Sequence, residues 1–352
     1  MAEPFFKQNQ TFIIAELSAN HGHDLDTALA LVKVAKESGA DAIKIQTYTP
    51  DTITLDCSNE YFQIKHGTIW DGTTLHKLYA EAYTPWEWHG PIQEATEREG
   101  LIFFSTPFDL TAVDFLESLY VPLYKIASFE IVDLPLIRRV AATGKPLIMS
   151  TGMATLAEID EAVRAFREAG GSELVLLKCT SAYPTPPNEM NLRTIPHLAE
   201  AFGVHAGLSD HSLGVSAPVV AVSLGARVIE KHLTLDRSKP GPDNAFSLEP
   251  HEFKEMVAAV RAAEDALGSV TYEATENEKS SRAFRRSLFV VEDVQAGEVF
   301  TARNVRSIRP AYGLSTRHME EVLGRRAARN LERGTPLSWN VIASDVPAGE
   351  EA

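Results

Sequence analysis

Polar and charged side chains recur where short apolar segments of this chain end. In chain order these segment ends carry Glu16, Lys44, Gln46, Thr106 with Phe108, Lys125, Ser128, Glu130, Ser150, Ser181, Tyr183, Ser209, Asp210, His211 and His232. Two lysines among several hydroxyl groups suit a ligand with a phosphate and a carboxylate, because lysine supplies point charge and Ser and Thr supply oriented donors. We therefore predict that these residues bind an anionic small molecule.

The two lysines, Lys44 and Lys125, also allow other interpretations. A buried lysine needs a partner, so each could form a structural salt bridge inside the fold. One of them could instead form a Schiff base with a carbonyl substrate, as in an aldolase. We favour ligand binding and keep the Schiff-base aldolase as an alternative.

His211 and His232 lie at the ends of the last two apolar segments. Imidazoles on neighbouring strands could share one divalent cation, with Asp210 and Glu230 beside them. Two imidazoles do not complete a structural zinc site, and they leave positions for water and substrate, as catalysis with Mn²⁺ or Mg²⁺ requires. We predict that these histidines hold such a metal. Cys179 is predicted to be a small packed side chain and not a nucleophile.

Eight short apolar segments must position these residues. The predicted strands span 12–16, 42–46, 102–105, 123–127, 147–150, 174–178, 205–208 and 227–231. Amphipathic stretches lie between them, among them 26–38, 85–99, 156–169 and 216–224, and 250–267 follows the last strand. Strand and helix alternating eight times predict a (β/α)8 TIM barrel. An open doubly wound sheet would usually carry a glycine-rich phosphate turn, and no such motif follows a strand here.

Two regions depart from the alternation. The interval 47–101 is long and holds three of the four tryptophans, so on a barrel it forms either a substrate wall or a loop packed by its own aromatics. After the barrel, 1–268, we expect a linker at 269–284, a small β-rich domain at 285–345 and a disordered tail at 346–352. The strands expected in the small domain are 288–291, 299–300, 305–308 and 337–342.

Composition and charge exclude several classes of protein. The 352 residues carry a net charge of −15, which argues against binding to nucleic acid or anionic membranes, since both are polyanions. No apolar run approaches the ~20 residues of a membrane span. Two cysteines make no disulfide framework, and the first residues lack the features of a signal peptide. We expect a cytoplasmic protein with small-molecule partners.

The ordered set of segment ends resembles the sialic acid synthase family, over about residues 10 to 342. The resemblance rests on Ala15-Glu16 with Asn20-His21, Lys44-Ile45-Gln46, Ser105-Thr106-Pro107-Phe108, Lys125-Ile126-Ala127-Ser128, Ser150-Thr151-Gly152, Gly207-Leu208-Ser209-Asp210-His211, Glu230-Lys231-His232 and Gly241-Pro242-Asp243. Residues 15–21, 47–54 and 82–88 are most similar to the branch that makes pseudaminic acid. The resemblance implies a barrel followed by an antifreeze-like (SAF) domain.

The resemblance also implies a reaction: metal-dependent condensation of phosphoenolpyruvate with an open-chain acylated amino sugar and water. In this branch the sugar is 2,4-diacetamido-2,4,6-trideoxy-altrose, and the products are a nine-carbon acid and phosphate, formed by C–O cleavage. The family's ligands of phosphoenolpyruvate match Lys44, Lys125, Thr106, Ser128, Ser150 and Ser209, and its metal ligands match His211 and His232. Glu16 or Glu130 would stabilise the oxocarbenium ion or orient water, and Asp243 would contact the sugar or a metal-bound water.

An arginine of the partner's antifreeze-like domain enters the active site in this family, and Arg309 matches it, which implies a domain-swapped homodimer. The chain departs from the family at Ala311, where glycine is common. It also departs from the sialic acid branch at Ser181 and at Gly22-His23, which argues against an N-acetylmannosamine substrate. The N-acetylneuraminic and legionaminic branches remain alternatives, and a glycan- or ice-binding module on an inert barrel fits least.

Overall fold

The computed structural model describes residues 10–65 and 67–344. Contacts divide the chain into two compact units, Met1–Gly268 and Ser269–Ala352. Among the helices of the described residues, none is long and apolar enough to cross a membrane. The tail predicted at 346–352 lies outside the described residues.

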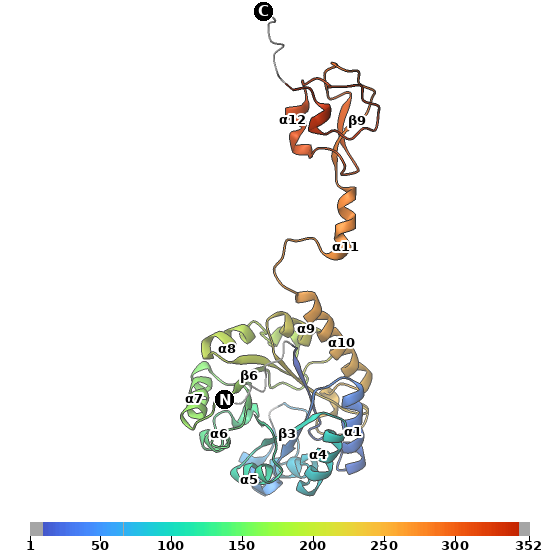
Figure 1. The fold of residues 1–352 in the computed structure, drawn as a ribbon. Coiled ribbons are helices and arrows are strands. Elements are labelled where there is room, and N and C mark those ends of the chain that lie inside the picture. Colours follow the sequence, from blue (N-terminus) through green and yellow to red (C-terminus); the bar gives the residue numbers. More distant parts are fainter. Residues whose placement is uncertain (1–9, 66, 345–352) are drawn as a thin grey trace, which may run out of the picture. The chain divides into compact units, whose positions relative to one another are not determined.

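Eight parallel strands close into a barrel in the first unit (Figure 1). They are β1 (Phe12–Glu16), β2 (Ala42–Thr47), β3 (Ile102–Pro107), β4 (Tyr124–Ile126), β5 (Leu147–Ser150), β6 (Leu174–Cys179), β7 (His205–Asp210) and β8 (Val228–His232). Each strand pairs with the next, and β1 pairs with β8 to close the ring. The predicted TIM barrel is confirmed: β1 and β5 match the prediction at both ends, and the ends of the other strands differ by at most two residues.

Helices surround the strands, as Figure 1 shows. They are α1 (Leu25–Glu37), α2 (Pro50–Ile53), α3 (Leu75–Ala82), α4 (His89–Arg98), α5 (Leu110–Ser118), α6 (Leu134–Ala141), α7 (Leu156–Glu168), α8 (Thr194–Phe202), α9 (Ser216–Ser223) and α10 (Pro250–Leu267). Side chains cap several of them: Asp24 accepts from the Thr27 amide at α1, and Thr155 forms a capping box with Glu158 at α7. Caps of this kind contribute about 1 kcal/mol each.

The barrel interior is apolar below its carboxyl-terminal end. Its inner cluster consists of Ile14, Ala42, Phe104, Leu123, Ile148, Val175, Leu177 and Val228. Side chains alternate along a strand, so the next inward position on each strand lies one layer closer to the carboxyl-terminal mouth. Gly207 of β7 keeps the layer tight, because a Cβ there would lie 2.8 Å from a Leu177 methyl group. The sequence thus places polar side chains above a dry, packed floor.

The second unit is a small domain built on one antiparallel pair, β9 (Ser287–Val290) and β10 (Val305–Ile308). Short helices α11 (Glu276–Lys279) and α12 (Met319–Val322) belong to it, and α11 lies in the segment predicted as linker. The predicted strands at 299–300 and 337–342 are wrong. Val299 makes a single bridge with Arg326, and residues 339–341 form a helical turn. Pro336 makes a single bridge with Phe289, and it has no N–H to donate to a longer ladder.

Candidate active site at the barrel mouth

Two lysines and two carboxylates form one buried chain at the mouth of the barrel. Lys44 Nζ contacts Glu16 Oε2 and lies 3.8 Å from Glu230 Oε1, while Lys125 Nζ lies 3.7 Å from the same Glu230 oxygen. None of the four side chains is more than 5% exposed. Burial raises the pKa of Glu16 to about 7, although Lys44 opposes this shift. We call this group the lysine–carboxylate chain; its formal charges balance, so it holds two ammonium groups in a desolvated site.

Hydroxyl groups from neighbouring strands attach to this chain. Lys44 Nζ donates to Thr106 Oγ1 at 3.1 Å, and Lys125 Nζ donates to Ser150 Oγ at 2.7 Å. Ser209 Oγ donates to the shared oxygen of Glu230 at 3.1 Å. The structure therefore brings together both lysines and three of the predicted hydroxyl ligands.

Ser128 and Ser181 flank Gly152 beside the same group of strands. The Gly152 amide donates to Ser128 Oγ at 3.1 Å. A Cβ at Gly152 would lie 2.7 Å from that oxygen and would overlap Ser181 Oγ. A side chain at this position would displace the hydroxyls of two predicted substrate ligands, so glycine lets both approach the backbone.

Polar atoms at the mouth are buried without a protein partner. Among the described residues these include Glu230 Oε2, Glu130 Oε2 and His232 Nδ1. Buried polar atoms in folded proteins nearly always have a hydrogen-bond partner, so a cluster of exceptions needs an explanation. A bound polar ligand or ion would supply the missing partners.

The two histidines predicted to bind metal face one another. The ring centroids of His211 and His232 lie 5.3 Å apart. His211 Nδ1 lies 3.1 Å from the Thr180 carbonyl; when it donates there, the Nε2 lone pair remains available. Burial, together with the nearby positive charges, holds the pKa of His232 well below its ordinary value, so this ring is neutral and can ligate. In the described part of the chain, no set of three or more His, Cys, Asp or Glu is arranged to hold a metal.

Aromatic rings surround the histidine pair. Tyr183 lies 4.5 Å from the His211 ring, and Phe246 lies 5.0 Å from the His232 ring. Trp70, from the long interval after β2, lies 5.2 Å from Tyr183 and donates to the Pro242 carbonyl at 2.9 Å. This contact brings the interval against the segment that carries Asp243.

The same interval also packs on its own aromatic side chains. Tyr48 lies 5.6 Å from the Tyr79 ring and 5.1 Å from the ring of Phe108, a predicted substrate ligand. The packing of Tyr48 on Tyr79 agrees with the second interpretation, a loop held by its own aromatics. The substrate wall stays a prediction, with Trp70 as its candidate residue.

Three predicted site residues belong neither to the lysine–carboxylate chain nor to the histidine pair. Asp210 Oδ2 pairs with Lys231 Nζ at 2.6 Å, and its other oxygen accepts from Ser212. Because side chains alternate along β7, Asp210 points away from the interior that Ser209 faces, so the structure does not support its predicted substrate contact. Gln46 follows Lys44 on the same face of β2 and is half-buried. Arg309 is exposed in the second unit.

Sequence reasoning missed two members of the site and one contact. Glu230, which bridges the lysines, was considered only as a neighbour of the metal, although it shares a strand face with His232. Phe246, fully buried against both histidines, carries no sequence signal of its own. Cys179 is buried as predicted, but its Sγ lies 3.9 Å from His211 Nδ1. Burial raises the pKa of the thiol, and His211, Ser128 and Lys125 together outweigh this and lower the pKa to about 7.

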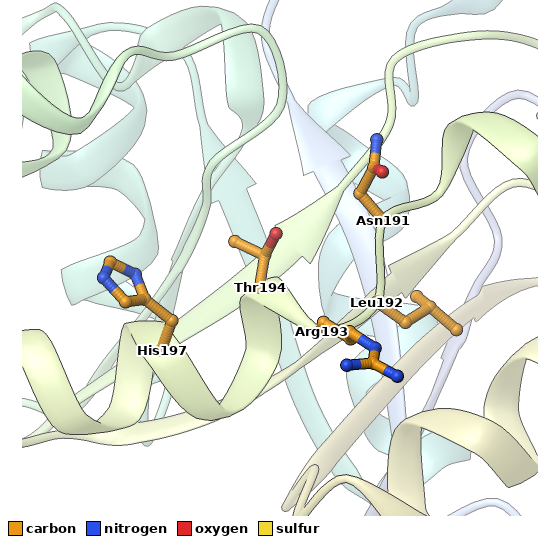
Figure 2. Close-up of a pocket in the computed structure, with 5 residues that line it drawn as sticks. All are labelled: Asn191, Leu192, Arg193, Thr194 and His197. Carbon is orange, nitrogen blue, oxygen red and sulfur yellow. The ribbon is translucent and has the colours of Figure 1, made fainter.

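A separate hollow opens at the start of α8 (Figure 2). It has a volume of about 510 Å³ and is lined by Asn191, Leu192, Arg193, Thr194 and His197. None of these side chains belongs to the lysine–carboxylate chain or to the histidine pair.

Comparisons with known proteins identify the family of this site. A model of the NeuB family matches residues 31–272, and a model of the SAF domain matches residues 285–343. The chain belongs to the NeuB family. This confirms the predicted family and the predicted barrel followed by a SAF domain. It also confirms the enzyme class, a phosphoenolpyruvate-dependent nonulosonic acid synthase acting as a transferase.

Individual members of the NeuB family show how this similarity is distributed. A pseudaminic acid synthase of Campylobacter jejuni is 49% identical over 333 residues, covering 95% of this chain and 97% of the relative. An N,N'-diacetyllegionaminic acid synthase of Legionella pneumophila is 38% identical, covering 94% of each chain. The crystal structure of the spore coat polysaccharide biosynthesis protein spsE of Bacillus subtilis superposes with a TM-score of 0.64, at 36% identity over 96% of both chains.

The buried carboxyl group of Glu130 should make the free energy of unfolding depend on pH. Burial raises the pKa of its carboxyl to about 7, although Lys125 opposes this shift. The folded state then keeps a proton that the unfolded state releases, so this contribution is full below about pH 4.5 and is lost as pH rises through 7. We expect Glu130→Gln to raise the free energy of unfolding by about 1–3 kcal/mol at pH 8 and hardly at all at pH 4.5.

Urea denaturation at the two pH values measures this effect. Glu99→Gln, at an exposed site on the same barrel, is the control and should change neither value. An equal effect of Glu130→Gln at both pH values would contradict the prediction.

Proposed function

We propose that this chain is a pseudaminic acid synthase that condenses phosphoenolpyruvate with 2,4-diacetamido-2,4,6-trideoxy-altrose and water, releasing phosphate. The observation that carries the proposal is the lysine–carboxylate chain beside the histidine pair. Lys44 and Lys125 offer two desolvated ammonium groups to a substrate that bears a phosphate and a carboxylate. The hydroxyls that accept from them at 2.7–3.1 Å keep their own protons free to donate to the same substrate. Such preformed charge is worth most where water is excluded.

The ligands of phosphoenolpyruvate are proposed to be Lys44 and Lys125 with the hydroxyl groups of Thr106, Ser128, Ser150 and Ser209. The ammonium groups neutralise the anion, and the hydroxyls fix its orientation. Glu230 supports this role because it holds both ammonium groups within 3.8 Å of one oxygen. Its spacing of the lysines prepares the site before the substrate enters.

The sugar is proposed to bind on the histidine side, near Gln46, Phe108, Ser181, Tyr183 and Asp243. A divalent cation held by His211 and His232, Mn²⁺ or Mg²⁺, would polarise the open-chain aldehyde. Glu16 and Glu130 are the carboxylates placed to stabilise positive charge at the former C2 of phosphoenolpyruvate or to orient the attacking water. The aromatic rings of Trp70 and Tyr183 suit a 6-deoxy sugar, whose methyl group replaces a hydroxyl.

Product formation from a panel of sugars tests this proposal. Purified protein is incubated with phosphoenolpyruvate, Mn²⁺ and one candidate sugar, and released phosphate and the nine-carbon acid are measured together. We expect turnover with the 2,4-diacetamido altrose, and at least about 100-fold lower kcat/KM with N-acetylmannosamine and with the precursor of the legionaminic branch. Preferred turnover of either of those sugars would assign the chain to the other branch.

Arg309 is proposed to act across a domain-swapped homodimer, in the barrel of the partner. We expect Arg309→Ala to lower kcat/KM about 100-fold, since a charged contact to an anionic substrate is lost. Arg306→Ala, at an exposed position in β10, is the matched control and should retain activity.

Mixing inactive variants tests whether Arg309 acts in trans. In a mixed dimer of Arg309→Ala and His211→Ala chains, one barrel has intact histidines and receives the intact Arg309. Co-refolded chains should therefore regain up to about a quarter of wild-type activity, because half of the dimers are mixed and each has one complete site. No recovery above the separate variants would show that Arg309 acts within its own chain or not at all.

A further inference from the structure

Ser18 has a backbone conformation that is rare for a residue with a side chain. It follows β1 with a φ of 41° and is 2% exposed. A left-handed conformation is unfavourable for a non-glycine residue, and it persists where the surrounding structure holds the backbone in that geometry. Ser18 lies between two carboxylates of the candidate active site.

Both hydrogen-bond donors of Ser18, its amide and its hydroxyl, donate to carboxylates. Its amide donates to Glu16 Oε1 at 2.7 Å, and its hydroxyl donates to Asp243 Oδ2. The second bond joins positions 225 residues apart in the chain. The amide of Ala19 also donates to the Asp243 carboxylate, so this single turn holds that side chain.

We propose that Ser18 is a positioning residue that sets Glu16, in the lysine–carboxylate chain, relative to Asp243, on the side where the sugar binds. Because both donors belong to one residue, the left-handed φ fixes the angle between the amide and the hydroxyl, and hence between the two carboxylates. This inference rests on the proposed function, in which Asp243 contacts the sugar and Glu16 acts at the reacting carbon.

Position 18 allows the hydroxyl and the backbone to be varied separately. Ser18→Ala removes the hydroxyl and keeps the strained φ. Ser18→Gly removes the hydroxyl and relieves the strain. Ser18→Thr keeps the hydroxyl and adds a β-branch that increases the strain. Tyr120→Gly is the control for strain alone, since Tyr120 has a φ of 55°, is 85% exposed and lies before β4, at the opposite end of the barrel.

Steady-state kinetics with each substrate varied, together with thermal unfolding, test the proposal. We expect Ser18→Ala and Ser18→Gly both to lose about 10- to 100-fold in kcat/KM for the sugar, the usual effect of removing a hydrogen bond to a charged group. The KM for phosphoenolpyruvate should stay within about twofold, because the lysines that bind it are untouched. Ser18→Gly should have a higher Tm than Ser18→Ala, and Tyr120→Gly should have a higher Tm than the wild type. Ser18→Thr should have a lower Tm than the wild type and nearly wild-type kinetics.

Three outcomes would overturn the inference. In the first, Ser18→Ala retains wild-type kinetics. In the second, Ser18→Gly alone regains activity, which would assign the effect to strain and not to the hydroxyl. In the third, the loss is equal for both substrates, as a general structural defect would produce. Wild-type enzyme assayed in parallel tests the proposed function separately: failure there means that it does not turn over these substrates at all. If Ser18→Thr does not fold, the comparison of alanine with glycine still decides.

Discussion

His211→Ala and His232→Ala are each expected to reduce kcat by at least about a thousandfold, corresponding to about 4 kcal/mol of transition-state stabilisation. The reason is the geometry of the pair: centroids 5.3 Å apart, one ring oriented by the Thr180 carbonyl and the other buried with an unpartnered nitrogen. Losing either imidazole leaves one protein ligand of the pair for a divalent cation. Mn²⁺ titration of the metal-free protein should show binding by the wild type and none by either variant.

The fold should survive both substitutions, since neither ring carries a strand-pairing bond. Circular dichroism and Tm should stay close to those of the wild type. His251→Ala, at an exposed position on α10, is the control and should retain activity and metal binding. Full activity of either His211→Ala or His232→Ala in EDTA-treated buffer would defeat the metal assignment.

Lys125→Met is expected to lower kcat/KM for phosphoenolpyruvate by about a thousandfold or more. Methionine fills a similar volume without charge, so the substitution removes the ammonium group while the barrel floor stays packed. It also leaves a buried carboxylate with less compensation: burial alone would raise the pKa of Glu230, and Lys125 and Lys44 together hold it below its ordinary value. We therefore expect a loss of stability of about 3–5 kcal/mol.

A double variant separates the stability effect from the catalytic one. In Lys125→Met/Glu230→Gln both partners are neutral, so most of the lost stability should return while activity stays absent. Lys178→Met, on the outward face of β6, is the control and should retain activity. A borohydride-stable adduct on wild-type Lys125 with pyruvate would instead support the Schiff-base aldolase.

The barrel was predictable because its signals are local and repeated. Each strand is a short apolar run, and caps such as Asp24 and Thr155 mark where helices begin. The same alternation explains why Lys44, Lys125 and Ser209 are found where they were expected, since each lies on an inward position near a strand end.

Other parts of the site depend on strand register and long-range contacts. Asp210 lies at the end of its strand, where a ligand was expected. Its side chain follows the inward-facing Ser209 by one residue, so it faces outward and pairs with Lys231. The hydroxyl of Ser18 reaches Asp243 from a turn after β1, and no sequence pattern predicts the positive φ of Ser18 in that turn. In the small domain, isolated bridges such as that between Val299 and Arg326 stand where strands were predicted. Such irregular pairing leaves no periodic signal in the sequence, so it could not be predicted.

In the proposed reaction, the barrel mouth activates phosphoenolpyruvate for attack on a sugar aldehyde, with release of phosphate. The most direct measurement uses phosphoenolpyruvate labelled with ¹⁸O at the oxygen that bridges carbon and phosphorus, with the 2,4-diacetamido altrose as co-substrate and mass spectrometry of both products. Because the C–O bond is cleaved, we expect the label to appear entirely in inorganic phosphate and the nine-carbon acid to carry none. Label retained in the acid, or acid formed from pyruvate without release of phosphate, would contradict it.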